Sequence, residues 1–238
     1  MMPGFVPYSA PIHPIPFMLQ QAQSIEVLHA DASLLVLNKP TGLLAVPGRG
    51  EDKQDCLSLR VQALYPDALI VHRLDMATSG LMLMARGTDM QRALGKAFEN
   101  REVHKRYEAV VEGCLHNGAQ GGLDHWQLID LPIAVDWPRR PLRIIDAAHG
   151  KPSQTRWCAL AFDASSNSTR VALEPVTGRS HQLRVHMLAL GHPIVGDALY
   201  ASPAIAGAAA RLLLHACALA FAHPLSGQRM SFESPPPF

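Results

Sequence analysis

The chain has 238 residues, of which 48% are hydrophobic and 17% charged, and its formal net charge is +1 at pH 7. This apolar content excludes a largely disordered chain, and the small charge excludes a strongly basic domain, so any nucleic-acid contact must come from local clusters. No apolar run approaches the roughly 18 residues that cross a bilayer, and the first residues lack the pattern of a secretory signal. The four cysteines lie at least 44 positions apart, which fits neither a zinc knuckle nor a compact disulfide framework. We expect a soluble, cytoplasmic protein with reduced thiols and no membrane contact.

The first 24 residues differ in composition from the rest. Five prolines occur within the first 16 residues, a density that prevents regular structure and predicts an extended, mobile arm over residues 1–24. Regular patterns begin after Ser24. We therefore expect one folded domain over residues 25–238.

Strands and helices are mixed in the first half of that domain. The pattern predicts, in order, a buried strand in LLVLNKPTG, a helix in DCLSLRVQALYP, a short apolar strand in GLMLMAR and a helix in TDMQRALGKAFEN. Asp55 is the expected N-cap of the first helix, which stops before Pro66, and Thr88 is the expected N-cap of the second.

Strands dominate the second half. In EVHKRYEAVVEG, alternation places Tyr107 on the same side of a strand as its apolar neighbours. Residues 113–153 read as a long connection with short strands. Four further strands are predicted, with one helix in GRSHQLRVHMLALGHP that has Ser180 near its N-cap. Because strands outnumber helices without regular alternation, we expect an α+β fold with a mixed, largely antiparallel sheet flanked by helices and loops.

Familiar cofactor motifs are absent from the sequence. It contains no dinucleotide-binding glycine motif, no P-loop and no paired-histidine zinc motif. His181, His186 and His192 are spaced by five and six positions, which does not stack them on one helical face. We expect no metal and no cofactor, and chemistry carried by protein side chains alone.

The segment HRLDMATSG is the most informative stretch. Asp75 can simply cap the Thr-Ser turn that follows it, a common use of Asp. Three features favour a functional carboxylate instead: Arg73 lies two residues before it, the cationic segment GRSHQLR lies far downstream, and Tyr107 occupies an inward strand position. These residues leave both interpretations open.

Three long segments together resemble one family. HRLDMATSG resembles the catalytic motif of the RluA-type pseudouridine synthases, LVLNKPTGLLAVPG resembles their first motif, and TGRSHQLRVHMLALGHPIVGDALY resembles their third. The match runs in the right order from about Ile25 to Phe232. It implies a pseudouridine synthase fold without an N-terminal S4 domain. Two segments, DLPIAVDWPRRP and GRSHQLRVHMLALGHP, most resemble the member that modifies both 23S rRNA and tRNA.

The resemblance implies a role for three side chains. Asp75 matches the essential Asp, Arg184 matches the Arg that pairs with it through two hydrogen bonds, and Tyr107 matches the Tyr that stacks on the uracil and assists proton removal. Without the family, Arg184 would be a solvated helix residue and Tyr107 an aromatic residue packed across the sheet.

The resemblance also implies RNA contacts. Arg73 matches an Arg that inserts into the RNA when the target uridine leaves its stack, and a surface phosphate contact is the alternative. Lys39 is expected to anchor its own turn. The remaining candidate phosphate contacts are Arg86, Arg106, Arg139, Arg140 and Arg179, each of which can equally be a solvated charge.

The expected function is isomerisation of specific uridines in stem-loops of 23S rRNA, tRNA (the anticodon stem-loop) or both, by a monomer. The alternative is a non-catalytic RNA-binding or ribosome-assembly protein on the same fold, and an intact set of Asp75, Tyr107 and Arg184 argues against it. A glycosidase would need two carboxylates around the scissile bond, and this motif offers one.

Overall fold

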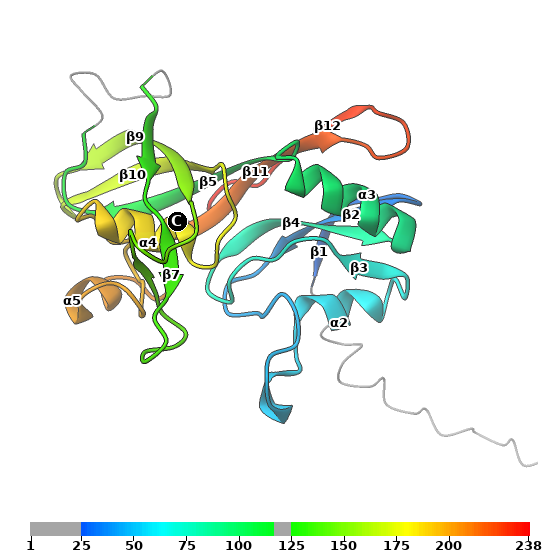
Figure 1. The fold of residues 1–238 in the computed structure, drawn as a ribbon, viewed down its shortest axis with the longest axis horizontal. Coiled ribbons are helices and arrows are strands. Elements are labelled where there is room, and N and C mark those ends of the chain that lie inside the picture. The colour runs from blue at the N-terminus through cyan, green and yellow to red at the C-terminus, as the bar shows by residue number, and fades with distance from the viewer. Residues whose placement is uncertain (1–24, 117–124) are drawn as a thin grey trace, which may run out of the picture.

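The computed structural model describes residues 25–116 and 125–238. The arm predicted at residues 1–24 lies outside the described residues. The described part contains one large sheet with few helices on it (Figure 1). The helical segments are η1 Glu51–Lys53, α2 Leu57–Gln62, α3 Thr88–Glu99, α4 Gln182–Ala189 and α5 Pro203–Ala206.

Ten strands form the main sheet, and two form a separate hairpin. The main sheet runs β1-β2-β4-β11-β5-β10-β9-β6, with β12 paired to β11 and β3 paired to β4. β7 pairs with β8, and its Ile133 also forms a bridge with Lys151. Between the named strands of the described residues, every pairing is antiparallel except that of β11 with β4, so the expected α+β class with a mixed, largely antiparallel sheet is confirmed. The strands are β1 Glu26–Ala30, β2 Leu34–Lys39, β3 Ala68–Ile70, β4 Ser79–Arg86, β5 His104–Glu112, β6 Gln127–Asp130, β7 Ile133–Val135, β8 Arg143–Ile145, β9 Gln154–Asp163, β10 Ser168–Pro175, β11 Leu214–Ala222 and β12 Arg229–Glu233.

Strand β11 joins the two halves of the sheet. Its beginning pairs with the beginning of β4 through His215 opposite Ser79 and Ala216 opposite Gly80. Gly80 has φ +111°, and a Cβ there would overlap the backbone of Ala216. Only glycine lets the two strands approach this closely. The loop that carries Asp75 is therefore fixed at the centre of the sheet.

The core is divided among three clusters of buried side chains. One lies under β5, β9, β10 and α4 and includes Tyr107 and Leu183. A second lies between β2, β4 and α2, and a third lies between β2, β4, β11 and α3, where Leu94 is buried. Along β5, Tyr107, Ala109 and Val111 are buried while the residues between them are half-buried, which confirms the predicted alternation.

Two helix starts differ from the prediction by one residue. The N-cap of α2 is Cys56, because Asp55 instead uses its carboxylate to accept two hydrogen bonds from Arg60. The N-cap of α3 is Gly87, whose φ of 77° turns the chain out of β4 so that Thr88 is already the first helical residue. Glycine tolerates such a turn without strain.

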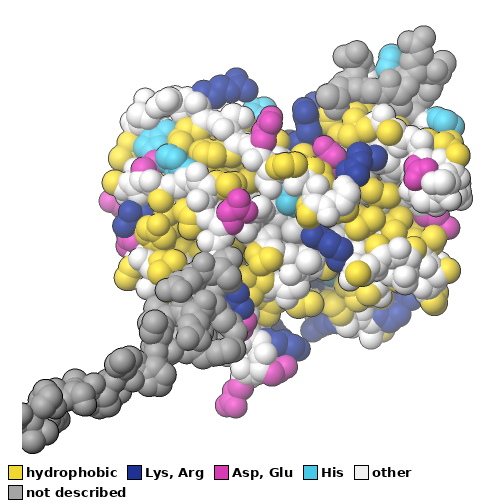
Figure 2. All heavy atoms as spheres, turned by 180° about the vertical axis from the view of Figure 1, so that it is seen from behind, with side chains coloured by type: hydrophobic (Ala, Val, Ile, Leu, Met, Phe, Trp, Pro, Cys, Tyr) yellow, Lys and Arg dark blue, Asp and Glu magenta, His cyan; other side chains and the backbone are white. Residues whose placement is uncertain are grey.

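Charge is mixed on the face turned away from the view of Figure 1. Figure 2 shows Lys and Arg side chains there interspersed with Asp, Glu and apolar side chains. The described residues contain no helix long and apolar enough to span a membrane.

Candidate active site

One pocket collects the three predicted catalytic side chains. Asp75 lies in the loop between β3 and β4, Tyr107 lies on β5 and Arg184 lies on α4. All three line a pocket of about 1130 Å³, slightly larger than the roughly 300–1,000 Å³ of small-molecule sites. These segments are far apart in the sequence, so the fold itself assembles the site.

Arg184 lies between two carboxylates. Its Nη1 is 3.5 Å from Oδ2 of Asp75, while its Nε and Nη2 donate to Asp197 at 2.8 and 2.6 Å. The Arg184 side chain is 5% exposed and that of Asp197 is fully buried. The predicted pairing of Arg184 with Asp75 is present, but the two-hydrogen-bond geometry belongs to Asp197. Burial opposes its charge, yet the bonds and charge of Asp197 raise the pKa of Arg184.

The Asp75 carboxylate does not cap the turn. The amide of Thr78 donates to the backbone carbonyl of Asp75, and no hydrogen bond from the described residues reaches the carboxylate. Its Oδ2 lies 3.5 Å from Nη1 of Arg184 and 3.9 Å from Nε2 of His181. The side chain is 29% exposed. The charge of Arg184 therefore holds the carboxylate, which stays partly exposed in the pocket.

Arg73 and Asp75 flank the buried Leu74. Arg73 is exposed at the rim of the pocket, and its side chain makes no hydrogen bond or ion pair with the described residues. The preceding residue, His72, anchors this segment, because its Nε2 accepts the amide of Leu83 at 2.8 Å and its ring stacks on Phe98. Burial lowers the pKa of His72 to about 3, so the ring stays neutral. His72 thus holds the backbone of this segment in place, and the guanidinium of Arg73 extends from it without a partner among the described residues.

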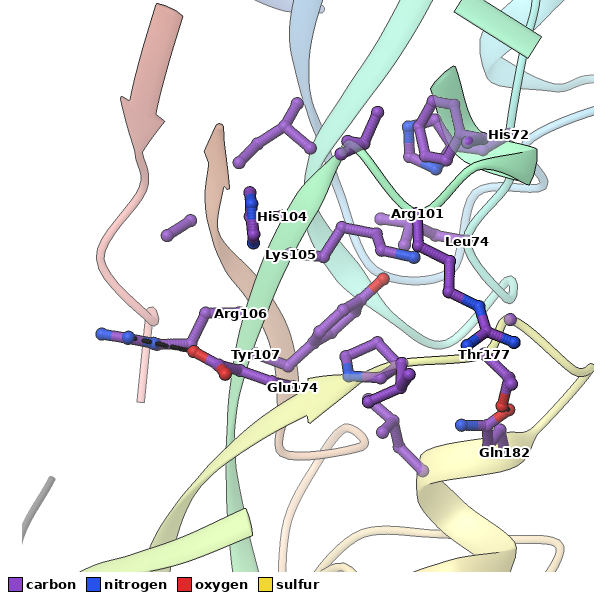
Figure 3. Close-up of a pocket in the computed structure, with 18 of the residues that line it drawn as sticks. His72, Leu74, Arg101, His104, Lys105, Arg106, Tyr107, Glu174, Thr177 and Gln182 are labelled. Carbon is purple, nitrogen blue, oxygen red and sulfur yellow. Dashed lines mark hydrogen bonds and ion pairs between the residues drawn. The ribbon is translucent and has the colours of Figure 1, made fainter. Parts of the chain in front are cut away.

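Tyr107 forms the floor of the pocket. Figure 3 shows its ring reaching from β5 toward the loop of Leu74, whereas Arg106 points to the other side of β5 and meets Glu174. Burial, and then the nearby charge of Asp75, raise the pKa of Tyr107. The phenol therefore keeps its proton and faces the same space as the carboxylate.

His181 and Tyr200 were missed from the sequence. The N-cap of α4 is His181, whose φ of 59° makes a left-handed turn, and Ser180 lies next to the N-cap as expected. The Tyr200 hydroxyl accepts the amide of Arg143 at 2.9 Å and lies 2.6 Å from Nδ1 of His181. The Tyr200 hydroxyl can therefore donate its own proton to Nδ1 of His181. The ring proton of the neutral His181 is then on Nε2, the nitrogen that faces Asp75. The pKa of His181 is lowered by burial, against the attraction of Asp75.

Lys39 does more than anchor its own turn. Its ammonium is buried and donates to the carbonyls of Pro40 and Leu43 and, 37 residues along the chain, of Met76. Burial lowers the pKa of Lys39 to about 7, although the negative charge of Asp75 acts in the opposite direction. The residue therefore ties the first motif to the backbone just after Asp75. In the sequence, only a Lys within an otherwise buried strand signals this role.

The pocket is basic. Its lining has twice as many cationic as anionic side chains: Arg73, Arg101, Lys105, Arg106, Arg156, Arg179, Arg184 and Arg229 against Asp75, Glu99, Glu174 and Glu233. Burial lowers the pKa of Lys105. A groove of this charge attracts a phosphate backbone.

The other predicted RNA-binding arginines are distributed unevenly. Arg106 and Arg179 line the pocket, although Arg106 is paired with Glu174. The structure does not bring Arg86, Arg139 or Arg140 to it. Arg86 pairs with Asp67, Arg139 pairs with Asp136, and Arg140 lies over the ring of Trp137.

The three spaced histidines have separate partners. His181 bonds Tyr200, His186 bonds Thr155 and the carbonyl of Leu131, and His192 bonds the carbonyl of Glu112. No group of three His, Cys, Asp or Glu side chains within residues 25–116 and 125–238 is placed to hold a metal ion.

Known proteins share this sequence and fold. The sequence model of the RNA pseudouridylate synthase family matches residues 33–189. The dual-specificity RNA pseudouridine synthase RluA of Escherichia coli O6:H1 is 49% identical over 212 residues, which cover 89% of this chain and 93% of that protein. The protein of the same name from Vibrio vulnificus is 48% identical over 84% of this chain and 79% of its own length. The solved human RNA pseudouridylate synthase domain containing 1 is 27% identical, with a TM-score of 0.73, over 91% of this chain and 85% of that one.

The chain therefore belongs to the RNA pseudouridylate synthase family. Within that family it is of the RluA type, and it is an RNA-modifying isomerase with the pseudouridine synthase fold. The resemblance of the three motifs is confirmed.

Proposed function

We propose that this enzyme isomerises specific uridines in stem-loops of both 23S rRNA and tRNA, using the side chain of Asp75 and no cofactor. It acts as a cytoplasmic monomer, in keeping with one chain supplying Asp75, Tyr107 and Arg184. The observation that carries the proposal is the position of Asp75, which faces a basic pocket with Arg184 held 3.5 Å away.

The reaction breaks the bond from N1 to C1′, turns the uracil and joins C5 to C1′. The C5 proton leaves and N1 gains a proton, so atoms balance without an oxidant or reductant. Asp75 must be ionised, whether it attacks C1′ or removes the proton at C2′. Arg184 favours that ionised form, and because Asp197 already occupies two of its nitrogens, it does not bind both oxygens of Asp75.

Tyr107 supports the base and its proton transfer. Its ring offers a stacking surface for the uracil between β5 and the loop of Leu74. Its buried hydroxyl stays protonated, so it can hydrogen-bond the turning base. It can take up the C5 proton only as it passes its own proton on to a carboxylate or a water molecule in the pocket. The carboxylate of Asp197 does not serve as a second catalytic acid, because it is fully buried and bound to Arg184, which argues against the glycosidase alternative.

The target uridine has to leave its stack to reach Asp75. Unstacking a base costs a few kcal/mol, which a side chain that fills the gap offsets. Arg73 suits this role because it is exposed, unpaired among the described residues and two positions from Asp75. The surrounding cations contribute affinity that does not depend on sequence.

Dual specificity is proposed from the relatives. Several proteins that are 47–49% identical to this chain carry the name dual-specificity RNA pseudouridine synthase RluA. A loop suits the pocket, because its bases can be splayed out and stacked on aromatic side chains such as Tyr107.

Mapping of the product tests this proposal. Purified protein is incubated with unmodified transcripts of tRNA and of 23S rRNA, and pseudouridines are located by carbodiimide labelling. We expect one modified uridine in the anticodon stem-loop of tRNA and at least one in a 23S rRNA stem-loop. Modification of one class alone would overturn dual specificity. Binding without any product would favour the non-catalytic alternative.

A further inference from the structure

A second pocket lies beside the active site. The hairpin of β7 and β8 and the segment 178–180 enclose about 690 Å³, and Gly178 and Arg179 line this pocket and the active-site pocket alike. In Figure 1 the hairpin projects next to α4, the helix that carries Arg184. A ligand that enters the active site can therefore extend into the second pocket without leaving the protein surface.

The pocket contains an exposed aromatic ring. Trp137 is 66% exposed and contributes to the lining. The guanidinium of Arg140 lies 3.6 Å from the centre of the ring, so one face is covered and the other is left for a ligand. Arg139 beside it is held by Asp136. An aromatic ring that is exposed in a pocket offers a stacking surface for a planar ligand.

Cations surround this ring. Arg143, Lys151 and Arg179 line the pocket, and the ammonium of Lys151 has no hydrogen bond or ion pair with the described residues. Among the described residues, Asp146 is the one carboxylate in the lining. It accepts the amides of Ala148 and His149, so its charge is directed into its own turn. Arg143 and Arg179 donate to backbone carbonyls and keep their charge. A flat ring with these cations nearby suits a base and its phosphate.

The pocket is also connected to the catalytic carboxylate. The amide of Arg143, at the start of β8, donates to the Tyr200 hydroxyl, which bonds His181. His181 in turn faces Asp75 at 3.9 Å. The hairpin that builds the second pocket is thereby fixed to the active site by hydrogen bonds rather than by chain connectivity alone.

We propose that the second pocket binds another unstacked nucleotide of the same RNA loop, with its base on Trp137 and its phosphate near Lys151 and Arg179. This inference rests on the proposed function, because the ligand is the RNA whose uridine enters the active site. It assigns part of the recognition of the loop to the β7–β8 hairpin.

Equilibrium binding tests the pocket without requiring turnover. The dissociation constant of a fluorescein-labelled anticodon stem-loop RNA is measured by anisotropy for the wild type and for Trp137→Ala, Trp137→Phe and Lys151→Gln. We expect binding about tenfold weaker for Trp137→Ala, and within about threefold of the wild type for Trp137→Phe, which keeps a stacking surface. Lys151→Gln weakens binding and lowers its dependence on salt. Phe162→Ala and Lys96→Gln, at exposed positions outside both pockets, serve as matched controls.

An abasic scan identifies the nucleotide. Each loop position of the same RNA except the target is made abasic in turn, and the binding penalty is measured with the wild type and with Trp137→Ala. We expect one position whose penalty largely disappears in Trp137→Ala, because the base and the ring then form a coupled pair. The second pocket is not a nucleotide site if, at every loop position, the abasic penalty is the same in Trp137→Ala as in the wild type. The same conclusion follows if Trp137→Ala binds the RNA as tightly as Phe162→Ala does. Product formation by the wild type is scored separately, so loss of the proposed function would be seen on its own.

Discussion

Asp197 holds Arg184 by two hydrogen bonds of 2.6 and 2.8 Å and leaves its third nitrogen 3.5 Å from Asp75. One guanidinium therefore serves a structural carboxylate and a catalytic one. The structural pair fixes where the positive charge lies, and the catalytic carboxylate remains free to react. Arg is suited to this because its planar fork offers donors in several directions.

Removal of the structural carboxylate should weaken both the fold and the site. In Asp197→Asn the buried Arg184 loses its charged partner, and breaking a buried pair in this way typically lowers the free energy of unfolding by about 3–5 kcal/mol. Urea unfolding measures this. Asp89→Asn, which breaks an exposed pair with Arg92, should change it by less than about 1 kcal/mol. If the two substitutions lowered the free energy of unfolding equally, the buried pair of Asp197 and Arg184 would contribute no more to stability than an exposed pair.

Patterns along the chain predicted the fold better than they predicted the ends of helices. The alternation in β5 and the apolar run of β4 are strong local signals that the sheet confirms. The N-caps of α2 and α3 each lie one residue away from the prediction. In each case the deciding factor was a contact or backbone turn, Asp55 binding Arg60 or Gly87 turning the chain at φ 77°, which residue preference alone does not reveal.

Tyr107→Phe should retain the fold and RNA binding while slowing product formation. The ring still packs, but the hydroxyl that assists proton removal is lost, and such a group contributes roughly 10²–10⁴-fold to a rate. Single-turnover kinetics on the tRNA stem-loop would measure the loss in kcat. A rate within twofold of the wild type would restrict Tyr107 to stacking.

Arg73→Ala should affect folded RNA more than unstructured RNA. If Arg73 fills the gap left by the target uridine, its loss should lower kcat/KM on a stem-loop by roughly 10–100-fold, because the few kcal/mol of unstacking are no longer offset. A single strand of the same loop sequence should lose much less. Arg229→Gln removes a pocket cation that is remote from the Asp75 loop and should weaken both substrates alike. An equal loss for Arg73→Ala on both RNAs would contradict the insertion role.

His215 should make the fold sensitive to mild acid. It is buried behind the active-site loop, where its ring nitrogens bond Ser79 and Ser234. Burial, and then the charge of Arg211, lower its pKa from 6.5 to about 4. At pH values between about 4 and 6.5, His215 is protonated in the unfolded chain and neutral in the folded chain. The free energy of unfolding therefore falls as pH falls from about 6.5 to 4, by up to about 1.4 kcal/mol per pH unit from this group.

Urea unfolding between pH 4 and pH 7 checks this dependence. His215→Gln keeps hydrogen-bonding capacity without titrating, so its stability curve should be flatter than that of the wild type across the window. His149→Gln, at a side chain that is 83% exposed, should leave the slope unchanged. A slope in His215→Gln equal to that of the wild type would assign the acid sensitivity to other groups.

The candidate site was only partly predictable from sequence. Motif resemblance predicted Asp75, Tyr107 and Arg184, and the structure brings all three together. It did not reveal that Asp197 is the principal partner of Arg184, although that carboxylate stands within the third motif. Nor did it reveal that Lys39 binds the carbonyl of Met76. Both depend on long-range packing between segments that no local periodicity relates.

The most direct test of the account is tritium release from RNA labelled at uridine C5, because the C5 proton leaves only when C5 joins C1′. Wild type, Asp75→Asn and Asp67→Asn are compared, with circular dichroism and RNA binding measured alongside. The account predicts release by the wild type and by Asp67→Asn, and no release by Asp75→Asn despite intact fold and binding. Appreciable release by Asp75→Asn would contradict the assignment of Asp75 as the catalytic carboxylate.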